Sequence, residues 1–133
     1  MQWEIRHLAG DEIVSIRITG EVDPGRFDAL TGEALACSAR NGAFRFMLDC
    51  RSSTLAAARI REPLMPLLAR PLLPSRAYRL AWIVGDAGQT GELHDDAPDF
   101  DARQQVFSRP SFALYWLAGR KPRPYSGRML LPA

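Results

Sequence analysis

The sequence has few residues of the kinds that build disulfide scaffolds or metal sites, with two cysteines and two histidines among its 133 residues. Cys37 and Cys50 lack the Cys-x-x-Cys spacing of zinc and redox motifs, so we expect two buried free thiols in a reducing compartment. No apolar run approaches the roughly 20 residues that span a bilayer. The first residues alternate in polarity and carry charge, unlike a signal peptide. The sequence therefore predicts a cytoplasmic protein without stable membrane association.

Lysine is also scarce, because Lys121 is the only lysine among the 17 basic residues and the other 16 are arginines. Arginine makes bidentate contacts with carboxylates and phosphates. The arginines are scattered along the chain and form no patch in the sequence. The net charge is +2, which is too close to zero to indicate a nucleic-acid partner. We predict none.

The sequence lacks the motifs of common catalytic sites. It contains no Gly-x-Ser-x-Gly elbow, no P-loop and no Gly-x-Gly-x-x-Gly. Oxygen-rich side chains gather in the polar segment 88–101, but their spacing matches no metal-binding loop, and a solvated loop is the simpler interpretation; these residues are Glu92, His94, Asp95, Asp96, Asp99 and Asp101. We predict no enzyme, no cofactor and no metal. An enzyme that uses Cys50 or this acidic loop is the alternative.

Hydrophobic periodicity predicts the fold. Runs with period two at the start of the chain indicate an antiparallel hairpin, and two short apolar runs indicate strands covered on both faces. Stripes with helical spacing alternate with these runs, although prolines restrict the second one. We expect strands at 3–8, 14–19, 44–50, 78–84 and 104–107, and helices at 24–40, 63–70 and 110–119, with an earlier turn at 56–59. The fold class is α/β, a mixed sheet of about five strands with an N-terminal antiparallel hairpin and helices packed against it.

The predicted domain covers residues 1–119, and residues 120–133 form a basic, proline-containing tail. The tail contains Met129-Leu130-Leu131, which we expect either to pack on a neighbouring subunit or to remain disordered or packed on its own domain.

Four motifs occur in an order that points to a known family. They are Gly20-Glu21-Val22-Asp23, Leu48-Asp49, Ala81-Trp82-Ile83-Val84-Gly85-Asp86, and Val106-Phe107 followed by Ser108 as a cap and Ala113-Leu114-Tyr115-Trp116-Leu117. The chain resembles the SpoIIAA-like family, within the STAS group of sulfate transporter and anti-sigma-factor antagonist domains. The resemblance implies a STAS/SpoIIAA-like fold and a non-enzymatic regulatory module that binds another protein or a second copy of itself. A small-ligand or lipid-binding module of the same fold is the alternative.

The first candidate site follows the third strand and consists of Arg51, Ser52, Ser53 and Thr54. Ligands of α/β sheets collect at the carboxyl ends of strands, and hydroxyls at a helix start can bind an anion. Ser52 or Ser53 is also a candidate phosphate acceptor. Anti-sigma antagonists, which the chain resembles, carry an Asp-Ser-Ser/Gly-Gly type of phosphorylation motif near this position. Segment 49–55 lacks the glycine of that motif. Ordinary capping by these hydroxyls is the competing interpretation.

The second candidate is an apolar surface in the second helix, where leucines exceed what one helix face can bury. Such a surplus indicates a partner or ligand surface, with core packing as the alternative; the residues are Leu64, Met65, Leu68, Leu72 and Leu73.

Overall fold

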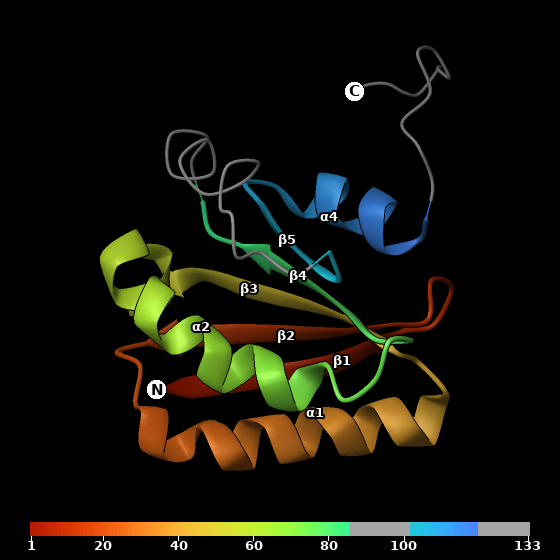
Figure 1. The fold of residues 1–133 in the computed structure, drawn as a ribbon, viewed down its shortest axis with the longest axis horizontal. Helices are drawn as coiled ribbons and strands as arrows, with labels where there is room; N and C mark the ends of the chain where they lie inside the picture. The colour runs from red at the N-terminus through yellow and green to blue at the C-terminus, as the bar shows by residue number, and fades with distance from the viewer. Residues whose placement is uncertain (86–101, 120–133) are drawn as a thin grey trace.

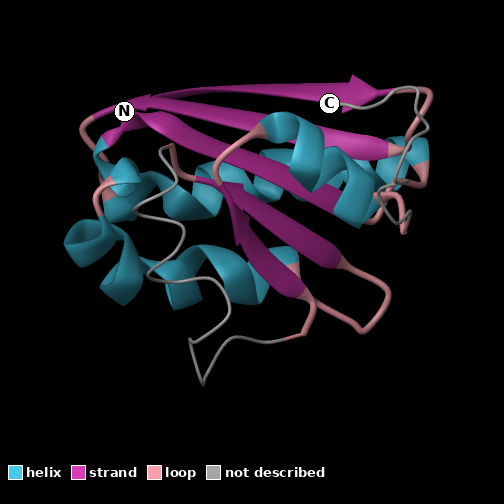
Figure 2. Ribbon diagram, turned by 90° about the horizontal axis from the view of Figure 1, so that it is seen from above, coloured by secondary structure: helices cyan, strands magenta, loops and turns pink. Residues whose placement is uncertain are grey.

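A computed structural model describes residues 1–85 and 102–119, which form one sheet with helices on both of its faces (Figures 1 and 2). The strands are β1 (Gln2–Leu8), β2 (Ile13–Gly20), β3 (Arg45–Ser53), β4 (Arg79–Ile83) and β5 (Gln104–Phe107). The helices are α1 (Phe27–Asn41), α2 (Ala58–Leu72) and α4 (Pro110–Leu117), with short 3-10 helices η1 (Pro24–Arg26) and η2 (Thr54–Ala56). The predicted segments 88–101 and 120–133 lie outside the described residues.

The five strands lie side by side in the order in which they occur along the chain, β1-β2-β3-β4-β5. β1 pairs with β2 in antiparallel register, and every later pair is parallel. The predicted mixed sheet with an N-terminal hairpin is therefore confirmed. The four parallel strands share a carboxyl edge, where β3 ends at Ser53, and an amino edge, where β4 begins at Arg79.

Alternation along the strands divides the apolar side chains between two cores. The larger core lies under α1 and α2 and contains Ile16, Leu48 and Trp82, which are fully buried. The smaller core lies under α4 and joins Ile83 to Leu117. Figure 1 shows α4 on one side of the sheet and the other two helices on the opposite side. Burial on both faces explains why the runs that form β3 and β4 are almost continuously apolar.

The first helical segment begins and ends at the residues that the sequence indicates. Asp23 caps η1 by accepting a hydrogen bond from the Gly25 amide, with Pro24 in the first turn. Gly42 ends α1 with φ 61°, a left-handed conformation that glycine adopts without a Cβ clash. These local signals were sufficient because none of them depends on distant contacts.

The second helix is longer than predicted, because it runs through its prolines. Pro63, Pro66 and Pro71 lie inside α2, whereas the sequence indicated a helix over 63–70 with a separate earlier turn at 56–59. A proline in a helix interior removes one backbone hydrogen bond and costs about 3 kcal/mol in an isolated helix. In this fold the buried stripe that includes Leu68 and Leu72 offsets that cost.

Most of the residues of α2 that were predicted to form a partner or ligand surface are buried. Met65, Leu68, Leu72 and Leu73 are buried in the larger core, and Leu64 packs against it. Burial of Met65, Leu68, Leu72 and Leu73 favours the core-packing alternative for these residues, whereas Leu64 is only half-buried. Leu67, at 54% exposure, is the exposed large apolar side chain of α2.

The last helix begins at Pro110 as expected, but its N-cap is one residue later than the sequence indicated. Arg109, rather than Ser108, occupies the N-cap position of α4, and no side chain caps this helix. Pro110 stands in the first turn, where its missing N–H is not needed. Among the described residues, no helix is long and apolar enough to cross a membrane.

Candidate functional site

The predicted Arg51–Thr54 segment lies at the carboxyl edge of the sheet, but most of it is still strand. β3 continues to Ser53, beyond the predicted end at residue 50. The register against β2 shifts here, with Arg17 opposite Asp49 but Thr19 opposite Ser52. A β-bulge of this kind places one extra residue in β3 and turns the strand end. Ser52 is exposed at that end.

Two of the three candidate hydroxyl groups serve the backbone. The Ser53 hydroxyl donates to the Cys50 carbonyl at 2.9 Å and accepts from the Leu55 amide at 3.1 Å, which makes Ser53 the N-cap of η2. The Thr54 hydroxyl accepts from the Val22 amide at 3.0 Å. These bonds favour the capping interpretation for Ser53 and Thr54. Phosphorylation of the exposed Ser52 stays a prediction.

The Arg51 side chain is paired with Asp49, which lies two residues earlier on the same strand. Its Nε and Nη2 donate to the two Asp49 carboxylate oxygens at 3.0 and 2.9 Å, and its amide donates to the same carboxylate. Burial raises the pKa of Asp49, but the hydrogen bonds and charge of Arg51, helped by Arg17, outweigh burial and hold this pKa below its ordinary value. Asp49 is therefore a stable carboxylate that orients Arg51.

Arg61 is the most unusual residue near this edge, and the sequence did not single it out. Its side chain is fully buried in α2. Its Nη1 donates to the carbonyls of Leu55 and Ala56 at 2.9 and 3.0 Å, which fastens η2 to the helix. Its Nε and Nη2 are buried without a hydrogen-bond partner in the described part of the chain. Unsatisfied buried donors are costly. The two hydrogen bonds from Nη1 to the Leu55 and Ala56 carbonyls are therefore the polar contacts that hold Arg61 in this position and fix the turn that follows Ser52.

Cys50 does not have the properties of a nucleophile. Burial raises its pKa to about 12, the nearby Asp49 charge acts in the same direction, and the Arg61 charge only partly opposes them. The thiol therefore stays protonated at neutral pH.

The two histidines of the chain are not placed beside this thiol in the described residues. His7 pairs with Glu12 across the hairpin at 3.1 Å, and His94 lies outside the described residues. Cys37 and Cys50 are free and buried, as predicted.

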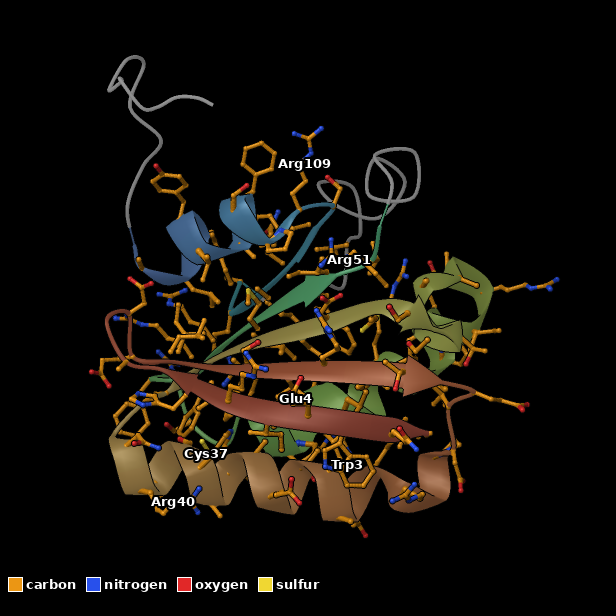
Figure 3. All side chains as sticks on the ribbon, turned by 180° about the vertical axis from the view of Figure 1, so that it is seen from behind. Trp3, Glu4, Cys37, Arg40, Arg51 and Arg109 are labelled. Atoms are coloured by element: carbon orange, nitrogen blue, oxygen red, sulfur yellow. The ribbon has the colours of Figure 1, made fainter. Side chains whose placement is uncertain are left out.

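A different surface is exposed next to the carboxyl edge, on the outer side of α4. Phe112 is 51% exposed and Tyr115 is 39% exposed, while Ala113 and Leu117 face the sheet. Arg109, also exposed, precedes them with the same spacing of three residues. Figure 3 shows Arg109 at the start of α4 and Arg51 on β3. We call Arg109, Phe112 and Tyr115 the α4 outer face.

The amino-acid composition of α4 indicates an exposed apolar face, which the family motifs of this segment do not. Seven of the eight residues of α4, PSFALYWL, are apolar or aromatic, so the helix has apolar side chains all round. Such a helix is normally covered on more than one side.

Within the described residues, no group of three or more histidine, cysteine and acidic side chains could hold a metal ion.

Comparison with known proteins gives a likeness of fold. No family model matches the chain, and no curated protein matches it. Among solved structures, the chain is similar to one described as the anti-sigma factor antagonist SpoIIAA in its unphosphorylated form. The match covers 84% of this chain and 92% of that chain, with 11% sequence identity and a TM-score of 0.47. At this identity the likeness concerns the fold alone.

Proposed function

We propose that the chain is a non-enzymatic regulatory module that binds another protein through the α4 outer face. The observation that carries the proposal is the exposure of Phe112 and Tyr115, two large aromatic side chains one helical turn apart. Aromatic residues and arginine are enriched at the energetic centres of protein interfaces. Arg109 supplies the charged member of such a centre at the end of the same stripe.

The chemistry of the carboxyl edge supports a binding role over a catalytic one. Asp49 and Arg51 are paired with each other, the Ser53 hydroxyl caps a turn, and the Cys50 thiol is buried with a raised pKa. Nucleophilic catalysis requires a nucleophile within reach of a base, and these groups are instead bonded within the fold or buried. A cytoplasmic location and a homodimer remain predictions.

A photo-reactive phenylalanine analogue at position 112 tests the proposal in cells of the native host. The proposal expects cross-links from position 112 to another protein and none to that protein from the same analogue at Leu67, which is 54% exposed on the opposite side of the sheet. The captured protein is then purified, and its affinity is measured for the chain and for two variants. Phe112→Ser/Tyr115→Ser should weaken binding by about 100-fold, equivalent to roughly 2.7 kcal/mol. Leu67→Ser should change it less than about twofold.

The outcomes separate the occupants of this face. Cross-links confined to a second copy of the chain would replace the proposal with a homodimer, which sedimentation at several concentrations would measure. Cross-links confined to the same molecule would show that the chain covers its own helix, and the proposal would be rejected. Equal loss of affinity in the Leu67 variant would also reject it.

A further inference from the structure

Arginines that are scattered in the sequence meet at the amino edge of the sheet, opposite the end where the sequence predicted a site. Arg45 begins β3 and Arg79 begins β4, and these two residues are register partners. Arg76 lies in the turn before β4, and Arg103 immediately precedes β5. Parallel strands begin at a common edge, so four guanidinium groups come from one small region.

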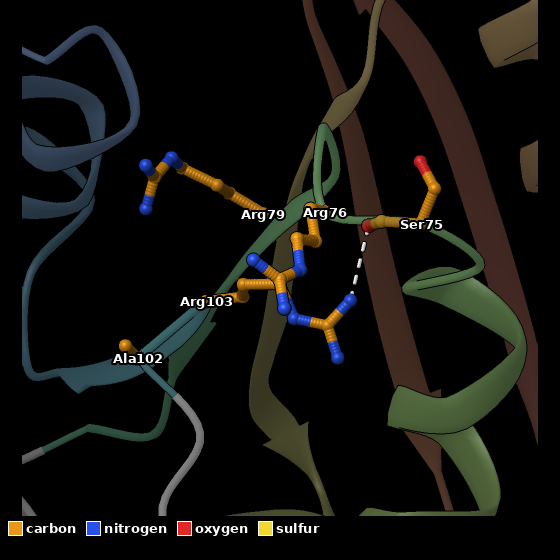
Figure 4. A pocket seen from close by; sticks show the side chains of 5 residues that line it. All are labelled: Ser75, Arg76, Arg79, Ala102 and Arg103. Carbon is orange, nitrogen blue, oxygen red and sulfur yellow. Dashed lines mark hydrogen bonds between the residues drawn. The ribbon is translucent and has the colours of Figure 1, made fainter.

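Three of these arginines line a depression with a volume of about 580 Å³. Its described lining is Ser75, Arg76, Arg79, Ala102 and Arg103, and none of these residues is acidic. Figure 4 shows the side chains of Arg76 and Arg103 close together in the depression, while Arg79 points away toward α4. The Arg79 guanidinium lies 5.9 Å from the centre of the Trp116 ring. The like charges of Arg76 and Arg103 repel each other, and an anion between them would relieve that repulsion.

The two arginines of the β4 strand start lack an acidic partner. Arg76 and Arg79 form no ion pair within residues 1–85 and 102–119. Elsewhere in the described chain, Arg6 and Arg51 are each paired with a carboxylate. Arg76 and Arg79 therefore carry positive charge that no ion pair within the described residues neutralises.

Arg103 removes an obstacle to anion binding. Its Nη1 donates to the carbonyl oxygens of Leu73 and Ser75, at 3.3 and 3.0 Å, just beyond the end of α2. The carboxyl end of a helix carries partial negative charge and disfavours anions. The Arg103 guanidinium neutralises these carbonyls and is held at the rim of the depression by them.

A second depression adjoins the first and shares Arg103. It has a volume of about 220 Å³. Besides Arg103, its lining consists of Pro66, Ala69, Arg70, Leu73 and Gln104. The combined site offers a strongly cationic part and a less polar part. Ligand sites for small molecules commonly have volumes of roughly 300–1,000 Å³, so the first depression alone has a suitable size.

We propose that the amino edge binds a soluble small molecule through a phosphate or pyrophosphate group held by Arg76 and Arg103, with Arg79 as a further positive charge in the lining of the depression. Several guanidinium groups favour an anion with two or more charges and several acceptor oxygens over a single carboxylate. A concave site favours a small molecule over a membrane surface. The remainder of the ligand lies in the depression beside Leu73. This site is independent of the α4 outer face, and its failure would leave the proposed protein-binding function untouched.

Calorimetric titration with inorganic pyrophosphate at low salt tests the proposal. Arg76→Gln/Arg79→Gln removes two charges from the site, whereas Arg40→Gln/Arg59→Gln removes two exposed charges from α1 and α2. We expect the wild-type chain and the Arg40/Arg59 variant to bind alike, and the Arg76/Arg79 variant to bind at least about tenfold more weakly. Amide NMR shifts on addition of pyrophosphate should be largest at Ser75 and Ala102. Thermal unfolding of all three proteins verifies that they are folded.

Several outcomes would reject the proposal. One is that the wild-type chain shows no saturable binding of pyrophosphate, and another is an equal loss of binding in the Arg40/Arg59 variant. Equal affinity for sulfate and pyrophosphate would reduce the site to a general anion site. Binding to vesicles that contain phosphatidic acid, without binding to pyrophosphate, would assign the arginines to a membrane surface instead.

Discussion

The two ends of the parallel sheet use their polar residues in opposite ways. At the carboxyl edge, Asp49 pairs with Arg51, the Ser53 hydroxyl caps η2, and Arg61 holds the carbonyls behind it. At the amino edge, Arg76 and Arg79 have no ion pair in the described chain and line an open depression. The carboxyl edge is the usual place for ligands in α/β sheets, yet here Asp49, Arg51 and the Ser53 hydroxyl are bonded within the fold. The exceptions at this edge are the exposed Ser52 and the Nε and Nη2 atoms of Arg61, which have no hydrogen-bond partner in the described chain.

The comparison indicates that hydrogen-bond donors, acceptors and charges without a partner are stronger evidence of a binding site than the position of a residue in the fold. A hydroxyl that already donates and accepts, as Ser53 does, has little left to offer a ligand. A guanidinium without a counter-charge has five N–H donors to place. If this contrast is correct, substitutions at the carboxyl edge should mainly change stability, and substitutions at the amino edge should not.

The largest effect is expected at Arg61. Arg61→Ala should lower the free energy of unfolding by about 3 kcal/mol, because it leaves a cavity and deprives the Leu55 and Ala56 carbonyls of their donor. Urea unfolding measures the change. Arg59→Ala, an exposed arginine of the same helix, is the control and should change stability by less than about 0.5 kcal/mol. Similar losses in both variants would remove Arg61 from its structural role.

The next effect depends on pH and concerns Asp49. Its folded pKa lies below the ordinary value of 3.8, so its contribution to stability is present above that pH and is lost as the pH falls through the folded pKa. Asp49→Asn should cost about 1.5 kcal/mol at neutral pH. The gap between the variant and the wild-type chain should narrow below about pH 4. Unfolding free energies measured across this range test it, and a gap independent of pH would contradict it.

A smaller effect should separate the two neighbouring serines. Ser53→Ala removes the N-cap of η2 and should cost about 1 kcal/mol. Ser52→Ala, at an exposed strand end, should cost less than about 0.5 kcal/mol. Urea unfolding of both variants provides the measurement. The carboxyl-edge assignment would fail if Ser52 proved the more costly of the two.

The smallest effect is expected at the amino edge. Arg76→Gln should change the free energy of unfolding by less than about 0.5 kcal/mol, and relief of repulsion from Arg103 should make the change neutral or stabilising. The same urea experiment measures it. A loss above about 1 kcal/mol would mean that Arg76 serves the fold, and the contrast between the two ends of the sheet would disappear.

Elements whose signals are local were predictable from the sequence. The hairpin, the buried stripe Phe27, Leu30, Ala34 and Cys37, and the stop at Gly42 all agree with the structure. The extent of α2 was not predictable, because proline propensity and core packing conflict there and packing prevails. The surplus leucines of that helix could not be assigned from spacing alone, since the sheet that buries them comes from distant parts of the chain.

The candidate sites show the same division. The sequence located Arg51–Thr54 at a strand end but could not show that Ser53, Thr54 and Arg51 are already bonded to Cys50, Val22 and Asp49. It also treated the arginines as scattered, although Arg76, Arg79 and Arg103 line one depression at the amino edge. Charge convergence between strand starts depends on strand order, which no local pattern contains.

The order of elements, the period of each strand and helix, and the scarcity of cysteine, histidine and lysine were determined by the sequence alone. Those properties follow from covalent neighbours and from the number of residues of each type. The tertiary structure decided which polar groups are satisfied and which are left to bind something else. Partners of a side chain are set by the pairing of strands and the packing of helices over the whole chain, so bonding capacity becomes visible only after folding.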